Sequence, residues 1–172
     1  KHSGKTTTGK ILADTLNYPF LDTDDVITTL SGKSPRELWD AGGAPLMMHW
    51  ETKACEQIRS RYGSSSSTLH CVLATGGGIA DNADACAILS ETGTTVYLDT
   101  AAELLFSRIE ESASRDGRLP PFLQGPDPRA KFLELFSRRT SRYATIADVT
   151  IETGRLSPEE ITTRIMDLLA HE

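Results

Sequence analysis

Cysteine is scarce in this chain, and its placement does not match a disulfide framework or a zinc site. Cys55, Cys71 and Cys86 are odd in number and lie in apolar stretches, so we predict buried free thiols in a reducing compartment. A cytoplasmic location is therefore expected. The four histidines show no metal-ligand spacing, and we expect no transition-metal site.

Long apolar runs and an excess of positive charge are also missing. No run approaches the roughly 20 residues of a membrane span. Lys and Arg total 18 against 24 for Asp and Glu, which gives a net charge of −6. An acidic surface argues against nucleic-acid and anionic-membrane partners, but a local positive site can still hold a small anion. We expect a monomer.

The 172 residues, 38% of them hydrophobic, instead alternate between strand and helix patterns. They suffice for one compact domain spanning 1–172, because no repeat or linker divides them. Strands are expected at 20–21, 70–74, 95–98 and 149–151. The strand at 70–74 is expected to be buried on both faces. Helices are expected at 4–16, 45–61, 83–89, 101–111, 127–143 and 157–169, and one or two short helices up to about 41, closed by Gly42 and Gly43. Asp127 and the capping box at Ser157 are expected to begin the last two helices, and loops are expected at 63–67 and 112–125. This alternation predicts an α/β fold, with helices on both faces of a parallel sheet.

The first residues, KHSGKT, match the last six positions of a phosphate-binding loop. A glycine turn lets backbone N–H groups surround a phosphate, and the following helix adds partial positive charge. Lys5 is expected to reach the β- and γ-phosphates of ATP, and the Thr6 hydroxyl to ligate Mg²⁺. The alternative is an unrelated Gly-Lys-Thr tripeptide ahead of a helix.

The strand that normally precedes such a loop is absent from the sequence, and the first glycine of the motif would fall two positions before Lys1. That strand is usually central, and a sheet without it would be badly exposed. We therefore expect an apolar strand ending in glycine upstream of Lys1.

Two aspartates follow the first expected strand, in the run Phe20-Leu21-Asp22-Thr23-Asp24. Residues two apart on a strand share a face, and two neighbouring carboxylates need a cation or a proton donor nearby. Asp22 suits Mg²⁺, and Asp24 suits a base that orients an acceptor hydroxyl. The alternative is helix capping by Asp24 or Asp25, which we prefer for Asp25 alone.

Three consecutive glycines, Gly76, Gly77 and Gly78, follow the strand expected at 70–74. Glycines at a strand's carboxyl end permit close approach of a ligand to the backbone, and ligands bind at that end of an open parallel sheet. The alternative is a plain flexible turn.

Together these pieces resemble the shikimate kinase family. The similarity is collinear over essentially the whole chain, and it is carried by GKTTTGKILADTL, YPFLDTDDVI, VLATGGGIA, VYLDTAAELLFSR, GRLPPFL and FSRRTSRYATIADVTIET. The resemblance implies a three-layer αβα kinase of the P-loop, nucleoside-monophosphate-kinase-like type. It further implies a five-stranded parallel sheet of order 23145, an acceptor-binding segment at about 25–62 and a mobile lid at about 112–126.

The resemblance also implies site residues. ATP would be bound by Ser3, Gly4, Lys5, Thr6, Thr7, Arg108, Arg118 and Arg155, with Arg108 on the adenine. Thr6 and Asp22 would hold Mg²⁺. The acceptor would contact Asp24, Gly76, Gly77, Gly78 and Arg139, with Arg139 on its carboxylate. Lys5, Asp24 and Arg118 would carry catalysis.

The arginine assignments have partial support from the residues themselves. Arg118 lies in a Gly/Pro-punctuated stretch suited to a lid that brings positive charge to a transferring phosphoryl group. Arg138, Arg139 and Arg142 cluster on one expected helix, and a guanidinium can bind a carboxylate through two hydrogen bonds. For Arg138 and Arg142 we prefer a solvated helix face, with Glu134 and Arg138 as an ordinary i,i+4 pair.

The chain departs from the family after Gly43. Ala44, Met47 and Met48 replace a glutamate, an aromatic residue and the arginine that would be a second clamp on the substrate carboxylate. Methionine cannot donate a hydrogen bond, and a lost charge-assisted pair costs about 1.5–3 kcal/mol. Met48 is alternatively a core residue, and Arg36 or His49 is a candidate replacement.

Three functions are therefore compatible with the sequence. The first is ATP-dependent phosphorylation of the 3-hydroxyl of shikimate. The second is the same chemistry on another small hydroxy acid, such as homoserine. The third is a nucleotide-binding regulator without catalysis, against which the intact Lys5, Asp24 and Arg118 argue.

Overall fold

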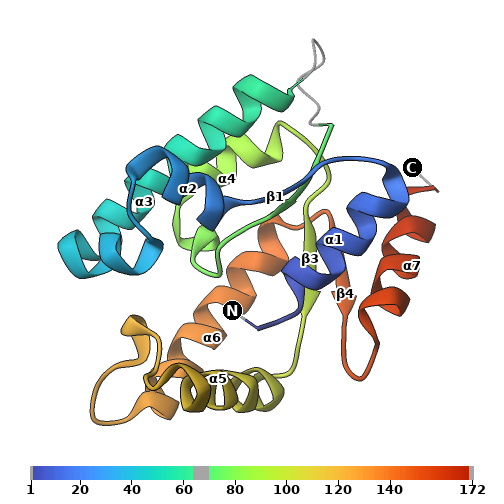
Figure 1. Cartoon of the computed structure of the whole chain (residues 1–172). Helices are drawn as coiled ribbons and strands as arrows, with labels where there is room; N and C mark the ends of the chain where they lie inside the picture. Colours follow the sequence, from blue (N-terminus) through green and yellow to red (C-terminus); the bar gives the residue numbers. More distant parts are fainter. Residues whose placement is uncertain (1, 64–69, 171–172) are drawn as a thin grey trace.

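The computed structural model describes residues 2–63 and 70–170. Helices and strands alternate along the chain as expected (Figure 1). The elements are α1 (Lys5–Leu16), β1 (Phe20–Asp22), α2 (Thr23–Ser31), α3 (Pro35–Tyr62), β2 (Val72–Ala74), the 3₁₀ turn η1 (Ile79–Asp81), α4 (Ala83–Ser90), β3 (Val96–Asp99), α5 (Ala102–Asp116), the 3₁₀ turn η2 (Pro121–Leu123), α6 (Pro128–Ile146), β4 (Val149–Glu152) and α7 (Pro158–Leu169). Most of the loop expected at 63–67 lies outside the described residues.

The four strands form two separate parallel pairs. In the first, Phe20 of β1 lies opposite Val72 of β2, and in the second, Val96 of β3 lies opposite Val149 of β4. The described residues therefore contain parallel pairing as predicted, but no single five-stranded sheet. The strand expected at 70–74 begins only at Val72 and is half-buried on much of its length rather than buried on both faces.

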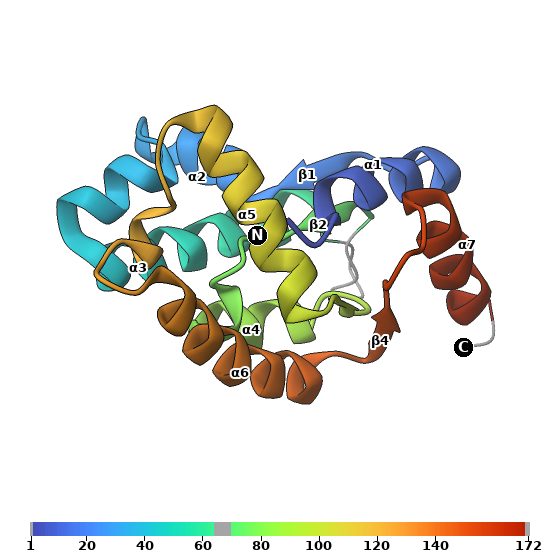
Figure 2. The ribbon, with the colours of Figure 1, turned by 90° about the horizontal axis from the view of Figure 1, so that it is seen from below.

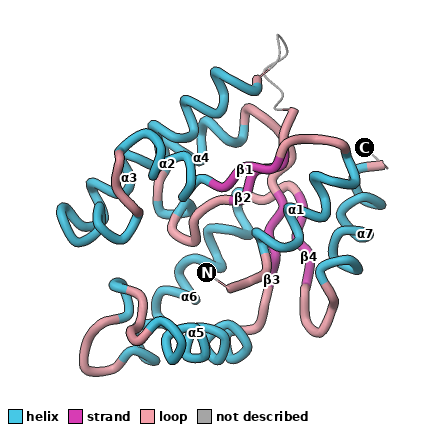
Figure 3. Tube along the Cα trace, viewed as in Figure 1, coloured by secondary structure: helices cyan, strands magenta, loops and turns pink. Residues whose placement is uncertain are grey.

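The helices enclose these strands on several sides (Figures 2 and 3). Helices α1 and α7 pack on β3 and β4 through a core that includes Leu12, Leu98 and Ile165. Helices α2 and α3 share a second core around Ile27, and α5, η2 and α6 share a third around Phe132. The two cavities described below are lined in part by residues of these cores.

Helix α3 is interrupted near the position where the sequence predicted a helix end. Ser34 and Glu37 form a capping box at its start, which satisfies backbone donors of the first turn. At Gly43 the backbone leaves helical geometry, with φ 60° and ψ −152°, and Pro45 follows. The positive φ is accessible to glycine at low cost. The element thus consists of two helical segments that meet at a kink at Gly43, which agrees with the predicted break between two helices at Gly42 and Gly43.

Helix α5 is longer than the sequence predicted. It continues through 112–116 and ends at Gly117, whose φ is 75°, so the predicted loop at 112–125 is wrong in its first part. Polar residues do not by themselves stop a helix, whereas a glycine in the left-handed conformation does. The irregular segment therefore begins at Gly117 and contains η2. The predicted capping residues of α6 and α7, Asp127 and Ser157, are confirmed.

The three cysteines are free, but only Cys55 is fully buried. Burial raises the pKa of the Cys55 thiol to about 12, so this cysteine behaves as a small apolar core residue. The prediction of buried thiols is therefore wrong for Cys71 and Cys86, which are partly exposed. Across residues 2–63 and 70–170, no helix combines the length and apolar character needed to cross a membrane.

Candidate active site

The amino end of α1 has the geometry of a phosphate-binding site. Gly4 caps the helix in a left-handed conformation with φ 91° and provides no side-chain cap for the first-turn N–H groups. These N–H groups carry partial positive charge that favours an anion. Ser3 lies beside them, where its Oγ accepts a hydrogen bond of 3.4 Å from Lys5 Nζ. Thr7 is exposed on the same first turn.

Lys5 is partly buried near two carboxylates. This burial lowers the pKa of its ammonium group, and the negative charges of Asp22 and Asp24 counteract this shift. A partly buried ammonium group with acidic neighbours is suited to bind a strongly charged phosphate chain. The convergence of Lys5 and Asp22 expected from the sequence is therefore present in the fold.

Thr6 and Asp22 meet at the end of β1. The Thr6 hydroxyl donates to Asp22 Oδ2 at 3.2 Å, although the two residues lie on different elements. The other oxygen of Asp22 accepts from the backbone N–H of Asp24 at 3.0 Å and caps α2. Hydroxyl and carboxylate oxygens are hard ligands of the kind Mg²⁺ prefers, so this pair fits the predicted ion.

Asp24 reaches the site by a different route from the one predicted. Strand β1 ends at Asp22 and α2 begins at Thr23, so Asp24 lies in the first helical turn and not on a strand face. The predicted cap at Asp25 is also wrong, because Asp22 is the cap and Asp25 is exposed. The early turn into α2 has a physical cause, since an Asp side chain that bonds the N–H two residues ahead favours helix initiation.

The glycine triplet is fixed against the same turn. The backbone N–H of Gly76 donates to the Thr23 hydroxyl at 2.9 Å. A Cβ on Gly76 would lie 3.2 Å from Asp24 Oδ1, and one on Gly78 would lie 3.4 Å from a guanidinium nitrogen of Arg139. Both contacts are tight, so the glycines allow the triplet to approach a carboxylate and an arginine closely. This argues against a plain flexible turn.

A cavity of about 210 Å³, here called the polar cavity, adjoins these residues. The helices α2, α3, α5 and α6 and the glycine triplet all contribute to its walls. Its charged lining residues are Asp24, Arg36, Glu51, Arg118 and Arg139. Trp39 and Met47 supply an apolar part of the wall. The mixture of a few charged groups with apolar surface is typical of small-molecule sites.

Arg139 is held at the polar cavity by Asp81. Its Nε donates to Asp81 Oδ2 at 3.0 Å, and its guanidinium lies 5.8 Å from the centre of the Phe122 ring. Arg138 and Arg142 pair with the same carboxylate at 3.0 and 2.6 Å. These two arginines are therefore ion-paired rather than simply solvated, and the ion pairs of the described residues do not include the predicted pair of Glu134 with Arg138.

The charge of Asp81 is stabilised by this cluster. Burial by itself would raise the pKa of Asp81, but the hydrogen bond and positive charge of Arg139, together with Arg138, hold that pKa below its ordinary value. The carboxylate is thus ionised at neutral pH and orients Arg139. One acid and three arginines leave this corner of the site positively charged, which favours an anionic ligand.

The other predicted arginines are spread over the molecule. Arg108 donates to the backbone carbonyl of His2 at 3.0 Å and so supports the phosphate-binding segment. Arg118 is exposed and lines the polar cavity from the segment after α5. Arg155 is exposed in the turn between β4 and α7, and no hydrogen bond or ion pair within the described part of the chain joins it to the other predicted site residues.

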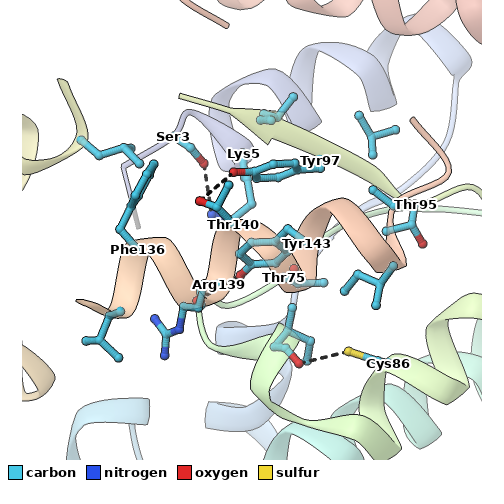
Figure 4. A pocket seen from close by; sticks show the side chains of 18 of the residues that line it. Ser3, Lys5, Thr75, Cys86, Thr95, Tyr97, Phe136, Arg139, Thr140 and Tyr143 are labelled. Carbon is cyan, nitrogen blue, oxygen red and sulfur yellow. Dashed lines mark hydrogen bonds between the residues drawn. The ribbon is translucent and has the colours of Figure 1, made fainter. Parts of the chain in front are cut away.

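A second cavity of about 160 Å³, here called the inter-sheet cavity, is lined by strand β3, by helices α4, α5 and α6, and by residues that follow β2 (Figure 4). Tyr97 and Tyr143 stack within it, with ring centres 5.1 Å apart. Burial raises the pKa of the Tyr143 hydroxyl to about 12, and this hydroxyl donates to the carbonyl of Gly77 at 3.0 Å. Lys5 and Arg139 also reach this cavity, but its lining is mainly apolar, so the polar cavity is the better candidate for a charged substrate.

Glu51 is a site residue that the sequence reasoning missed. It is only 4% exposed, lines the polar cavity and accepts a hydrogen bond from Asn82 at 3.1 Å. Burial raises its pKa, partly offset by the Asn82 hydrogen bond, and the nearby charge of Asp24 raises it further. A signal was available, because Glu51 follows Met47 by four residues on the apolar stripe of its helix.

The departures noted after Gly43 fall partly on the cavity wall. Met47 lines the polar cavity, whereas Met48 and Ala44 are not among its lining residues. The Met48 carbonyl accepts hydrogen bonds from Thr52 and Asn82, which joins α3 to the start of α4. Arg36, by contrast, reaches the cavity directly.

Comparison with known proteins agrees with this geometry. The family model described as shikimate kinase matches residues 1–170. A shikimate kinase from Trichormus variabilis is 33% identical over 97% of this chain and 85% of its own length. Another, from a Marinomonas species, is 32% identical over 97% of this chain and 86% of its own length.

Solved structures are similar as well. The shikimate kinase from Acinetobacter baumannii in complex with shikimate has a TM-score of 0.84 and 31% identity, with 98% of this chain and 88% of that chain covered. The shikimate kinase from Aquifex aeolicus has a TM-score of 0.77 and 27% identity, with coverages of 98% and 90%. The chain spans most of the length of these proteins, and it belongs to the shikimate kinase family.

Proposed function

We propose that this protein transfers the γ-phosphoryl group of ATP to the 3-hydroxyl of shikimate. The main observation in support of this proposal is that Lys5, Thr6 and Asp22 lie together at the end of β1. Asp24 extends from the same turn and lines the polar cavity. A phosphate-binding group and an acceptor-binding group thus adjoin one another. Membership of the family and the similarity to a relative in complex with shikimate support the same substrate.

The nucleotide is proposed to bind at the amino end of α1. Backbone N–H groups from Gly4 to Thr7 and the Ser3 hydroxyl surround its phosphates, and Lys5 neutralises their charge. Thr6 and Asp22 would hold Mg²⁺, which neutralises charge on the triphosphate when bound. Arg108 is proposed to contact the adenine and Arg155 the nucleotide, as in the family.

The acceptor is proposed to occupy the polar cavity. Its 3-hydroxyl oxygen forms the new bond to the γ-phosphorus as the bond from that phosphorus to ADP breaks. Asp24 orients the hydroxyl and accepts its proton, and Arg118 stabilises the negative charge of the transferring group. The glycines 76–78 lie along the ring of the acceptor, and Arg139 binds the carboxylate of the acceptor.

Three further features belong to this proposal. Residues 1–172 form one kinase domain, with an acceptor-binding segment at about 25–62 and a lid at about 112–126. The sheet is proposed to have five parallel strands in the order 23145. The parallel pairing of β1 with β2 and of β3 with β4 supports that order. A monomeric, cytoplasmic protein is also proposed.

The test is ADP formation from Mg-ATP with a panel of small hydroxy acids, together with ³¹P NMR of the product. We expect turnover with shikimate and a phosphate ester at its 3-hydroxyl. Turnover with homoserine alone would replace the substrate but keep the chemistry. Nucleotide binding without turnover on any acid would favour a regulator.

A further inference from the structure

Arg36 is an arginine of the polar cavity that the proposed mechanism does not use. It lies in the first turn of α3, after the cap at Ser34, and is partly buried. It lines the cavity together with Asp24 and Arg139. Arg36 is carried by α3, whereas the other proposed acceptor-binding residues lie on α2, in the glycine triplet and on α6.

The hydrogen bonding of Arg36 leaves most of its donors available. One terminal nitrogen donates to the backbone carbonyl of Leu119 at 3.2 Å. Within residues 2–63 and 70–170, Arg36 has no carboxylate partner, unlike Arg139, which is paired with Asp81. A guanidinium has five N–H donors in a planar fork, so a single carbonyl contact fixes its position without satisfying it.

The charges around the cavity explain why an anion would be drawn to Arg36. Arg139 shares Asp81 with two other arginines, whereas Asp24 is assigned to the acceptor hydroxyl. Glu51 has a raised pKa because it is buried, so it offers a weaker counter-charge than an ordinary glutamate. Arg36 is therefore the partly buried cation of this cavity that has no acidic partner in the described chain.

We propose that Arg36 binds the carboxylate of the acceptor as a second guanidinium beside Arg139. This inference rests on the proposed function and deepens it. Because the same side chain holds the Leu119 carbonyl in the segment after α5, acceptor binding is coupled to the position of that segment. Arg36 thereby supplies charge that Met48 cannot.

The test compares shikimate with its neutral carboxamide in the wild type and in Arg36→Ala. Replacing Arg36 should raise KM for shikimate about tenfold to a hundredfold, as expected for a lost charge-assisted contact. KM for the carboxamide and for ATP should change by less than about threefold. The preference for the acid over the amide should therefore fall by the factor by which KM for shikimate rises. Arg36→Lys should retain part of that preference, because it keeps the charge but not the planar fork.

The matched control is Arg164→Ala, which removes an equal charge from the exposed face of α7 and should leave the acid preference unchanged. If Arg36→Ala weakens acid and amide equally, Arg36 only supports the segment around Leu119, and the inference is wrong. If the wild type neither phosphorylates nor binds shikimate by calorimetry, the proposed function fails. If the wild type uses shikimate and Arg36→Ala keeps its full acid preference, only the inference about Arg36 fails.

Discussion

The two halves of the active site are built differently. The nucleotide end is compact in sequence, because Lys5, Thr6, Asp22 and Asp24 lie within twenty residues of one another and on the ends of three consecutive elements. The polar cavity is assembled from distant segments, which include α3, the glycine triplet, the segment after α5, and α6. We therefore expect phosphate binding to depend on a local motif and acceptor binding to depend on how the cores pack.

This difference indicates how freely the residues of each half of the site can vary. Phosphate and magnesium chemistry is the same for every acceptor, and it requires a lysine, a hydroxyl and a carboxylate in fixed relation. The cavity needs only complementary charge and shape, which several combinations of residues can supply. In this chain the phosphate-binding residues match the family pattern, while Ala44, Met47 and Met48 depart from it.

Asp24 is the residue where the two halves meet, and its loss should have the largest effect. We expect Asp24→Asn to lower kcat by about 10²–10⁴-fold, because the hydroxyl proton loses its acceptor. The affinity for ADP, measured by calorimetry, should change little. A kcat close to that of the wild type would remove Asp24 from the mechanism.

Lys5 tests the nucleotide end alone. Lys5→Met should lower kcat by about 10²–10³-fold, since a preorganised positive charge at the transferring phosphoryl group is removed. The free energy of unfolding should not fall, because burial of the charged group disfavours it in the native protein. A variant that loses shikimate affinity but keeps kcat would contradict the division into two halves.

Arg139 tests the polar cavity alone. Arg139→Ala should raise KM for the acceptor about tenfold to a hundredfold, while KM for ATP stays nearly constant. Arg142→Ala is the comparison, because it removes a half-exposed partner of the same aspartate, and exposed ion pairs contribute little. An equal rise in KM for both variants would mean that the net charge of the cluster matters and the position of Arg139 does not.

Glu51 makes the polar cavity sensitive to pH. Its pKa is raised by burial, so the folded state favours the protonated form, and this stability is lost as pH rises from the unfolded value through the folded one. Glu51→Gln should therefore increase the free energy of unfolding near pH 7.5, on the order of 1 kcal/mol. The gain should shrink toward pH 4, as measured by urea denaturation at both pH values.

Met48→Arg should have the smallest effect on the cavity. Met48 is not among the residues that line it, and Arg36 already supplies a second guanidinium there. We expect KM for shikimate to change by less than about threefold, which is under 1 kcal/mol. A tenfold lower KM would show that position 48 faces the carboxylate and that Arg36 does not replace it.

The sequence predicted the elements more reliably than the distances between them. Helix α7 was predicted from the capping box at Ser157, and the phosphate-binding end of α1 from the run that ends in Thr6, because both signals are local. The extension of α5 to Gly117 was missed because polar composition was treated as a loop signal. The early start of α2 was missed because Asp22 was assigned to a strand face and not to a cap.

The acceptor half was harder to predict for the same reason. The contact of Arg139 with Asp81 joins residues 58 positions apart, and neither residue alone indicates the other. The contact of Arg36 with Leu119 spans 83 positions. Glu51 is different, because the sequence carries a signal for it. A charged residue on an apolar helical stripe is visible in the sequence and indicates a buried polar site.

The cluster around Asp81 makes proposed acceptor binding by Arg139 depend on a residue that is not itself a proposed substrate contact. One carboxylate, 10% exposed at its side chain, holds guanidinium groups from three positions of α6 against the turn η1. Substituting this acid would leave three cations side by side, and their mutual repulsion would move Arg139 away from the turn. We therefore expect acceptor affinity to change on substitution at a position that lines neither cavity, which makes residue 81 a starting point for redesigning the acceptor range of this enzyme.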